Sequence, residues 1–310
     1  MNLNFTMYPL KRILVCLDMT DTDDILIRYA AMFGKTVQCE KLYFIHCVKS
    51  LELPEQLRKE FPEMAVPLDE TITQQLKENI SRHINQDEMS YDIGVKDGNT
   101  TENILKWANI KHVDLIVMGR KPAELGTGVN ANRIANVSPC SVLMVPQETK
   151  MTLNKIFVPI DFSPYSHRAL LRALTIKEKN DTEIVLQNVY NVPTGYHTTG
   201  KKYEEFAEIM NENAHKSYER FLKKNKLDKS AFKFITTLDG DNQPGDRIAT
   251  EAQQNGADLI MIGSRGRTTA ASLLLGSIAV ALLKYNYSIP CFIVKNKNEN
   301  MGFFQALMKL

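Results

Sequence analysis

Several features that identify common protein classes are missing from this chain of 310 residues. The five cysteines include no C-x-x-C pair and their number is odd, which favours reduced thiols buried in strands over a disulfide framework or a zinc site. No apolar run approaches the ~20 residues that would cross a bilayer, and residues 1–10 lack the layout of a signal peptide. We therefore expect a cytoplasmic protein without a transmembrane segment.

Catalytic motifs are missing as well. The sequence contains no G-x-x-x-x-G-K-[ST] loop, no G-x-S-x-G elbow and no H-E-x-x-H helix. Its six histidines are scattered without the spacing of metal ligands or of a catalytic triad. We therefore expect no metal site and no catalytic residue, and a function in binding rather than turnover.

A strong charge of one sign is also absent, since the net charge is +2. Residues 1–150 carry 17 Lys and Arg against 20 Asp and Glu, whereas residues 151–310 carry 21 against 16. The second half is thus the better candidate for an anionic ligand. So small an excess, without a basic stripe, indicates no nucleic-acid partner.

What the sequence does contain is an internal repeat of about 145 residues. Residues 11–18 match 155–161, residues 114–119 match 258–263, and residues 138–145 match 288–294. We expect domains at 1–147 and 153–296, joined by a polar linker and followed by a C-terminal tail at 297–310.

Each copy alternates short apolar runs with longer amphipathic segments. The second copy has such runs at 156–160, 184–189, 232–238, 258–262 and 291–294. Runs that are apolar throughout indicate strands buried on both faces, and their alternation with helices indicates βαβ crossovers and a parallel sheet. The sequence therefore predicts an α/β fold class, with two doubly wound, five-stranded parallel sheets in tandem.

A glycine pattern follows the fourth predicted strand of the second copy. Gly263 and Gly266 are followed after nine residues by Gly276 and Ser277, which precede an apolar helix at 278–284. Glycine allows positive φ and a close approach of the backbone to a ligand. The N–H groups of residues 276–278 would then lie at a helix start, where the unpaired donors and the helix dipole favour a phosphate.

This G-x2-G-x9-G-[ST] spacing resembles the ATP-binding signature of the universal stress protein family. Val158 to Leu170, with Asp161 and Ser163 at the strand end, resemble that family's first strand and helix. The resemblance covers residues ~10–295 and implies flavodoxin-like domains of the adenine nucleotide alpha hydrolase type.

The resemblance also implies a ligand, ATP or another adenine nucleotide in the second domain, and leaves open whether Mg²⁺ accompanies it. It places Asp161 near the ribose or the adenine, the backbone around Val189 at the adenine edge, and the glycines with Ser277 at the phosphates. Asp161 has a second interpretation as a turn residue that caps the helix, and Arg265 is either a phosphate ligand or a solvated loop residue. The predicted binding residues are Pro159, Asp161, Ser163, Val189, Gly263, Arg265, Gly266, Gly276, Ser277 and Ile278.

The first copy departs from the pattern in the same loop. Pro122 stands where the second glycine is expected and offers no N–H, and Glu124 adds a negative charge. We expect this loop not to bind a nucleotide. Residues 126–131 spell G-x-G-x-x-[GA], but they follow a fourth strand instead of opening a βαβ unit, so we interpret them as a chance match. Binding of a different anion by these glycines stays an open alternative.

For the whole chain, the resemblance implies a regulatory module that senses adenine nucleotide in stress. The alternatives are a scaffold that binds no nucleotide and recruits a protein partner, or a slow ATPase. Residues 303, 304, 307 and 308 of the tail share one helical face, which would pack on its own domain or dock on a partner or a membrane surface. We expect the two domains to form an internal pseudo-dimer through edge strands 141–145 and 291–294, leaving open a homodimer in addition.

Overall fold

The computed structural model describes residues 7–51, 67–120, 129–266, 274–286 and 288–297. Its contacts divide the chain into two units. Residues 8–151 with Asn296 and Lys297 form the first unit, and residues 152–295 with Met7 form the second. Within the part of the chain described, no helix is both long and apolar enough to cross a membrane.

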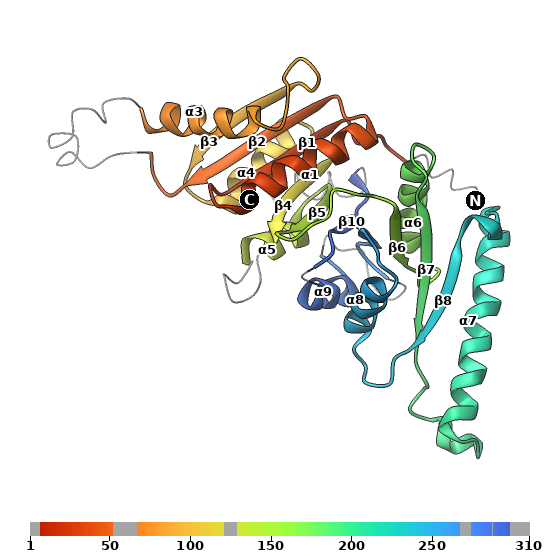
Figure 1. The fold of residues 1–310 in the computed structure, drawn as a ribbon. Coiled ribbons are helices and arrows are strands. Elements are labelled where there is room, and N and C mark those ends of the chain that lie inside the picture. Colours follow the sequence, from red (N-terminus) through yellow and green to blue (C-terminus); the bar gives the residue numbers. More distant parts are fainter. Residues whose placement is uncertain (1–6, 52–66, 121–128, 267–273, 287, 298–310) are drawn as a thin grey trace. The chain divides into compact units, whose positions relative to one another are not determined.

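The first unit is a parallel sheet with helices between its strands (Figure 1). Its elements are β1 (Arg12–Leu17), α1 (Thr22–Val37), β2 (Lys41–Val48), α3 (Leu68–Ser81), β3 (Tyr91–Asp97), α4 (Thr100–Ile110), β4 (Leu115–Arg120), α5 (Val129–Val137) and β5 (Ser141–Pro146). The strands follow the order β3-β2-β1-β4-β5, and all four pairs are parallel.

The second unit repeats this plan. Its elements are β6 (Lys155–Pro159), α6 (Pro164–Lys177), β7 (Glu183–Tyr190), η3 (Tyr196–Thr199), α7 (Tyr203–Asn225), η4 (Lys229–Ala231), β8 (Lys233–Leu238), α8 (Pro244–Gln254), β9 (Leu259–Gly263), α9 (Ser277–Tyr285) and β10 (Cys291–Val294). The order β8-β7-β6-β9-β10 is that of the first unit, again with parallel pairs throughout. The predicted fold class, two doubly wound five-stranded sheets, is confirmed.

The strands form where the sequence is apolar without interruption. Every residue of β5, β9 and β10 is buried, as expected for strands covered on both faces. In each unit one aspartate ties the start of the first strand to the fourth. Oδ2 of Asp114 accepts from the N–H groups of residues 11 and 12, and Oδ2 of Asp258 accepts from those of residues 154 and 155. The repeat thus extends from the sequence to individual hydrogen bonds.

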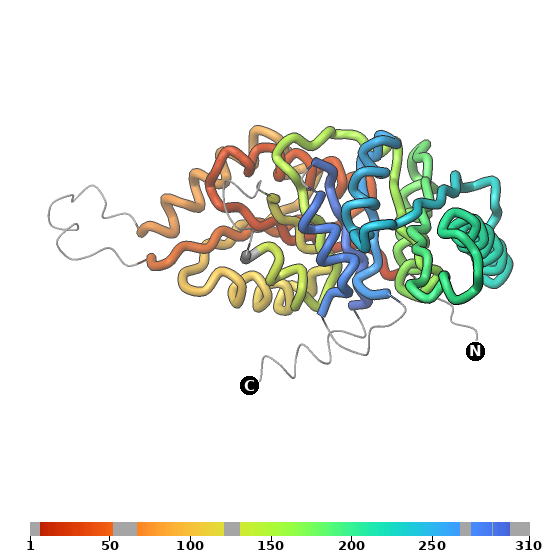
Figure 2. The backbone as a smooth tube through the Cα atoms, turned by 90° about the horizontal axis from the view of Figure 1, so that it is seen from below, coloured from red at the N-terminus to blue at the C-terminus, as the bar shows by residue number. Residues whose placement is uncertain are grey.

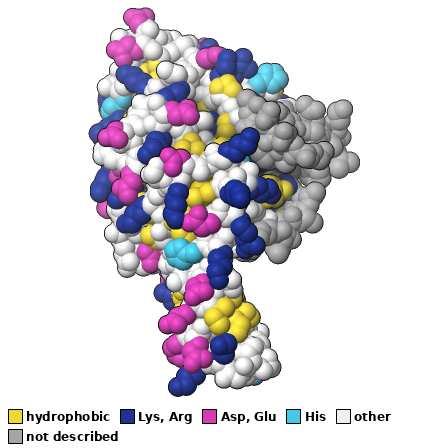
Figure 3. Space-filling model, turned by 90° about the vertical axis from the view of Figure 1, so that its right-hand side faces the viewer, with side chains coloured by type: hydrophobic (Ala, Val, Ile, Leu, Met, Phe, Trp, Pro, Cys, Tyr) yellow, Lys and Arg dark blue, Asp and Glu magenta, His cyan; other side chains and the backbone are white. Residues whose placement is uncertain are grey.

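Helices cover both faces of each sheet (Figure 2). In the second unit, α6 and α7 meet through His167 and Phe221, whose rings lie 5.5 Å apart. Helices α8 and α9 pack so closely that a Cβ on Gly245 would lie 2.6 Å from the carbonyl carbon of Ala281. The face on the α7 side carries Lys and Arg interspersed with Asp and Glu (Figure 3). The close α8–α9 pair is the feature that fixes the start of α9 beside the sheet.

Candidate functional site

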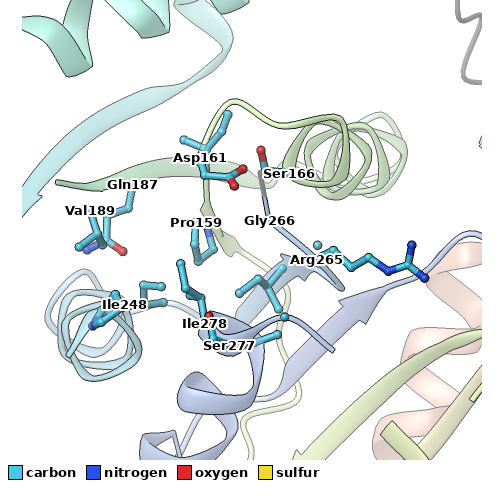
Figure 4. A pocket seen from close by; sticks show the side chains of 16 residues that line it. Pro159, Asp161, Ser166, Gln187, Val189, Ile248, Arg265, Gly266, Ser277 and Ile278 are labelled. Carbon is cyan, nitrogen blue, oxygen red and sulfur yellow. The ribbon is translucent and has the colours of Figure 1, made fainter. Parts of the chain in front are cut away.

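A cavity of about 270 Å³ opens in the second unit, near the carboxyl ends of β6, β7 and β9. Helices α8 and α9 complete its wall (Figure 4). The lining residues are Pro159, Ile160, Asp161, Ser166, Gln187, Val189, Pro244, Ile248, Ile262, Gly263, Arg265, Gly266, Gly276, Ser277, Ile278 and Ala279. Nine of the ten residues predicted from the sequence are in this set, and Ser163 is not. The carboxyl ends of strands in an open α/β sheet are where such folds bind ligands.

Ser163 has a structural role at the start of α6. Its side chain accepts the N–H of Ser166 at 3.2 Å, and Pro164 occupies the first helical position. Oδ1 of Asp161 accepts the N–H of Ser163 at 3.0 Å, which closes the turn between β6 and α6. The two interpretations of Asp161 are therefore compatible, because this residue shapes the turn and also lines the cavity. Ser166, one helical turn on, lines the cavity in place of Ser163.

The glycines of the loop allow close approach of backbones and do not provide positive φ. A Cβ on Gly263 would lie 2.7 Å from the carbonyl of Tyr165, so this glycine lets β9 touch α6. Gly276 has φ −68° and ψ 155°, which any residue adopts, and its Cβ would lie 3.3 Å from Cα of Arg265. Of the two reasons for glycine that the sequence offers, the structure shows close approach and not positive φ at both positions. What they give is room for the loop to fold back on itself.

The start of α9 forms one end of the cavity. The N–H of Gly276 donates to the carbonyl of Ser264 at 2.8 Å, so it closes the loop and is not the phosphate donor that the sequence predicts. The next three N–H groups, of residues 277–279, have no partner within the helix. All three residues line the cavity, and the first turn contains neither a capping side chain nor an acidic residue. This end of the cavity therefore favours an anion.

The guanidinium of Arg265 lies on the ring of Tyr165. The guanidinium carbon is 5.5 Å from the ring centroid, and Nη1 donates to the Tyr165 hydroxyl at 3.2 Å. In Figure 4 the side chain extends away from Pro159 and Val189. Arg265 thus contributes the inner part of its side chain to the cavity wall, while its charge is held on an aromatic face.

The opposite end of the cavity is mostly apolar. Val189 on β7 and Pro244 and Ile248 on α8 line this end, and Figure 4 shows Val189, Ile248 and Pro159 close to one another. The Asn188 side chain donates to the carbonyl of Ile160 at 2.7 Å and holds the ends of β7 and β6 together. A flat, apolar ligand group suits this end, since pockets for small molecules combine apolar walls with few polar contacts.

Sequence reasoning missed several lining residues. Ser166 and Ala279 belong to helix first turns, Pro244 and Ile248 come from α8, and Gln187 lies two residues before Val189 on β7. Residues i and i+2 of a strand share a face, so a polar residue in this apolar run was a usable signal for Gln187. For α8, whose place beside the cavity depends on packing between distant segments, the sequence contained no comparable signal.

The first unit has the same turn with different chemistry. Met19 and Phe162, which follow the aspartates at matching positions, both have positive φ, 58° and 65°. Four residues after Phe162 stands Ser166, and four residues after Met19 stands Asp23, which is buried. The Asp23 carboxylate accepts the N–H groups of Asp18 and Met19 at 3.1 and 2.8 Å. Burial raises its pKa to about 6. A carboxylate at this position disfavours an anionic ligand.

The altered loop of the first copy, with Pro122, Glu124 and residues 126–128, lies outside the described residues, as does the C-terminal tail from residue 298. The five cysteines are all free thiols, three of them half-buried and two buried. No group of three metal-ligating side chains occurs among the residues that the structure describes.

Two comparisons of the sequence give the same result. The universal stress protein family model matches residues 9–146 and again residues 152–295. Universal stress protein MJ0577 of Methanocaldococcus jannaschii is 28% identical over 160 residues, which are 47% of this chain and 96% of that protein. Universal stress protein YxiE of Bacillus subtilis is 30% identical over 148 residues, 46% of this chain and 99% of its own.

Solved structures agree on the fold. A functionally unknown protein of Pseudomonas aeruginosa has a TM-score of 0.68 at 14% identity, covering 97% of this chain and 98% of its own. A universal stress protein from Archaeoglobus fulgidus has a TM-score of 0.59 at 17% identity, covering 93% of this chain and 99% of its own. With two consecutive matches to one family model and a fold shared over nearly the full length, the chain belongs to the universal stress protein family as a tandem, two-domain member.

Proposed function

We propose that this protein binds an adenine nucleotide, ATP or a close relative, in the cavity of the second unit, and that it acts as a regulatory or sensor module in stress. The phosphates lie at the start of α9 and the base lies at the apolar end beside Val189. The observation that supports this most is that nine of the residues predicted from the sequence line one cavity. One end of this cavity is the start of α9, which has no capping side chain.

The charges along the cavity support this orientation of the ligand. N–H groups at residues 277–279 and the positive end of the α9 dipole suit phosphate oxygens. Asp161 lies by Gly266, where a Cβ on the glycine would be 3.1 Å from Oδ2. A carboxylate accepts hydrogen bonds and repels phosphate, so Asp161 suits a ribose hydroxyl between the two ends.

Mg²⁺ fits this site only together with a nucleotide. Asp161 is the one carboxylate among the described lining residues, and Mg²⁺ typically binds through one or two carboxylates plus the phosphates of the substrate. Nucleotide titrations in the presence of Mg²⁺ and in the presence of EDTA measure how much the ion contributes to nucleotide affinity. When bound, the ion would neutralise phosphate charge.

The deciding experiment is to release bound material from freshly purified protein with heat or acid and to identify it by chromatography and mass spectrometry. We expect an adenine nucleotide, close to one per chain. Calorimetric titration of the emptied protein then gives the affinity. Protein that carries no nucleotide and binds none on titration would support the alternative of a scaffold that recruits a protein partner. Release of phosphate from ATP over hours would instead identify a slow ATPase.

A further inference from the structure

One polar side chain at the apolar end of the cavity is only half satisfied. Gln187 on β7 is fully buried and lines the cavity. Its Nε2 donates to the hydroxyl of Thr237 at 2.9 Å. Its Oε1 has no hydrogen-bond partner among the residues described.

Exchanging the two amide atoms does not remove the problem. If Oε1 faced Thr237 instead, the hydroxyl would donate to it, and the amide NH₂ would lose its partner on the other side. An unpaired buried polar group costs free energy, and most such groups in proteins have a partner. One group of the amide is unpaired in either orientation, and in the orientation that the structure gives it is the acceptor Oε1.

The same strand position in the first unit is apolar. Gln187 is the register partner of Pro159, and Ile45 is the register partner of Cys16, at the matching place in β1 and β2. Ile45 is buried and needs no partner. The fold thus accepts an aliphatic side chain here, and the glutamine in the second unit calls for another explanation.

The location of Gln187 indicates what its partner is. It lies next to Val189 and Pro159 on the side of the cavity away from Ser277 and Gly266 (Figure 4). In the proposed binding mode this end holds the base. Of the lining residues on β7 and α8, Gln187 is the one with a polar side chain, among Val189, Pro244 and Ile248.

We infer that Gln187 determines the base specificity of the site, with Oε1 accepting a hydrogen bond from the exocyclic amine of a 6-aminopurine. This inference rests on the proposed function. A 6-oxopurine would place a second acceptor against Oε1, and a purine without a 6-substituent would leave Oε1 unpaired. Both are rejected because a buried polar group then remains without a partner.

The test compares ATP, inosine triphosphate and purine riboside triphosphate by calorimetric titration of the full chain and of Gln187→Leu. Wild type is expected to bind ATP about tenfold to a hundredfold more tightly than purine riboside triphosphate. In Gln187→Leu this ratio falls to within about threefold, through weaker binding of ATP and unchanged binding of the purine analogue. If Gln187→Leu does not fold, Gln187→Met replaces it in the same test, because methionine is unbranched and of similar length to glutamine.

Thr237→Val is the matched control, since it keeps Gln187 but removes the hydroxyl that orients its amide. Its ATP preference is expected to lie between those of wild type and Gln187→Leu. A preference that persists unchanged in Gln187→Leu and Gln187→Met overturns the inference while the proposed function stands. Wild type that binds all three nucleotides equally, or that prefers inosine triphosphate because the amide NH₂ faces the base, also overturns the inference alone. Wild type that binds none of them overturns both the inference and the proposed function.

Discussion

Gly276 is the residue at which the proposed nucleotide binding can be tested most directly. A side chain there would crowd the backbone of Arg265 and Gly266, since its Cβ would lie 3.3 Å from Cα of Arg265. We expect the loop to move in response and to displace the N–H groups at the start of α9. Gly276→Val is expected to weaken nucleotide binding by at least about 100-fold, because two or three charge-assisted hydrogen bonds of roughly 1.5–3 kcal/mol each are lost. Calorimetric titration measures the effect.

Two control variants show whether a loss of affinity in Gly276→Val is specific to this position. Gly195→Val changes a glycine whose added Cβ would meet no atom within 4 Å, so affinity should not change. Ser277→Ala removes one hydroxyl and keeps the backbone donor, so the loss should stay below about tenfold. If Gly126→Val in the first copy weakens binding as much as Gly276→Val, the first domain also binds, and the asymmetric assignment is wrong.

Asp23 predicts a specific pH dependence. Burial raises its pKa from 3.8 to about 6, so between these values the native state binds more protons than the unfolded state. Its contribution to stability is therefore present at low pH and is lost as the pH rises from about 4 to about 6. Relative to Asp23→Asn, wild type should lose on the order of 1–3 kcal/mol between pH 4 and pH 7.5.

Urea unfolding of both proteins at several pH values gives this difference. The comparison uses the change with pH and not the absolute stability, because asparagine cannot accept at both oxygens as Asp23 does. Curves that run parallel from pH 4 to pH 7.5 would mean that Asp23 titrates normally and is better solvated than its burial indicates.

Among the helices, α6 allows a test of whether Ser163 contributes to stability or to ligand binding. Its side chain caps α6 and lines no part of the cavity. Ser163→Ala should lower the free energy of unfolding by about 1 kcal/mol, the usual cost of a lost N-cap. Nucleotide affinity should change by less than about twofold. Thermal unfolding and titration of the same sample test both, and a large affinity loss at full stability would return Ser163 to the binding site.

The elements themselves were largely predictable from the sequence. Each strand of the second unit begins and ends within about two residues of its predicted run, because strands buried on both faces are apolar without interruption. The cavity residues were predicted partly from the family resemblance, which indicated Asp161 and Val189, and partly because strand ends and helix starts converge at one edge of a parallel sheet. That geometry follows from connectivity alone.

Side-chain directions were not predictable in the same way. Arg265 turns onto Tyr165, a neighbour 100 positions away in sequence, and the N–H of Gly276 closes onto Ser264. The unpaired oxygen of Gln187 depends on which residues of α8 and β8 reach it. Each of these contacts joins separate segments, so it is decided by packing and leaves no local pattern.

For the whole molecule, the differences between the two copies predict that only one of them binds a nucleotide. One nucleotide per chain is expected, in the second unit, because Asp23 replaces Ser166 in the first and Pro122 and Glu124 alter its loop. Calorimetry with wild type should give a value near one, and Gly276→Val should reduce it to near zero. A value near two would show that neither Asp23 nor the altered loop prevents binding.

The internal pseudo-dimer stays a prediction. If strands β5 and β10 meet as edges of the two sheets, cysteine pairs introduced along Ser141–Pro146 and Cys291–Val294 should cross-link within one chain. If the two strands are antiparallel, a cysteine placed later in β5 should cross-link best to a cysteine placed earlier in β10. Cross-links that form only between chains would instead indicate a homodimer.

Met19 and Phe162 have the same left-handed backbone conformation at matching positions of the two copies. A positive φ at a residue other than glycine is strained, yet both halves retain it after the same aspartate. The strain is present in the half whose loop sequence has lost the glycine pattern as well as in the half that keeps it. It therefore belongs to the turn, which the fold needs with or without a ligand. The turn after the first strand therefore keeps one backbone conformation in both copies, while the sequence of the loop after the fourth strand differs between them.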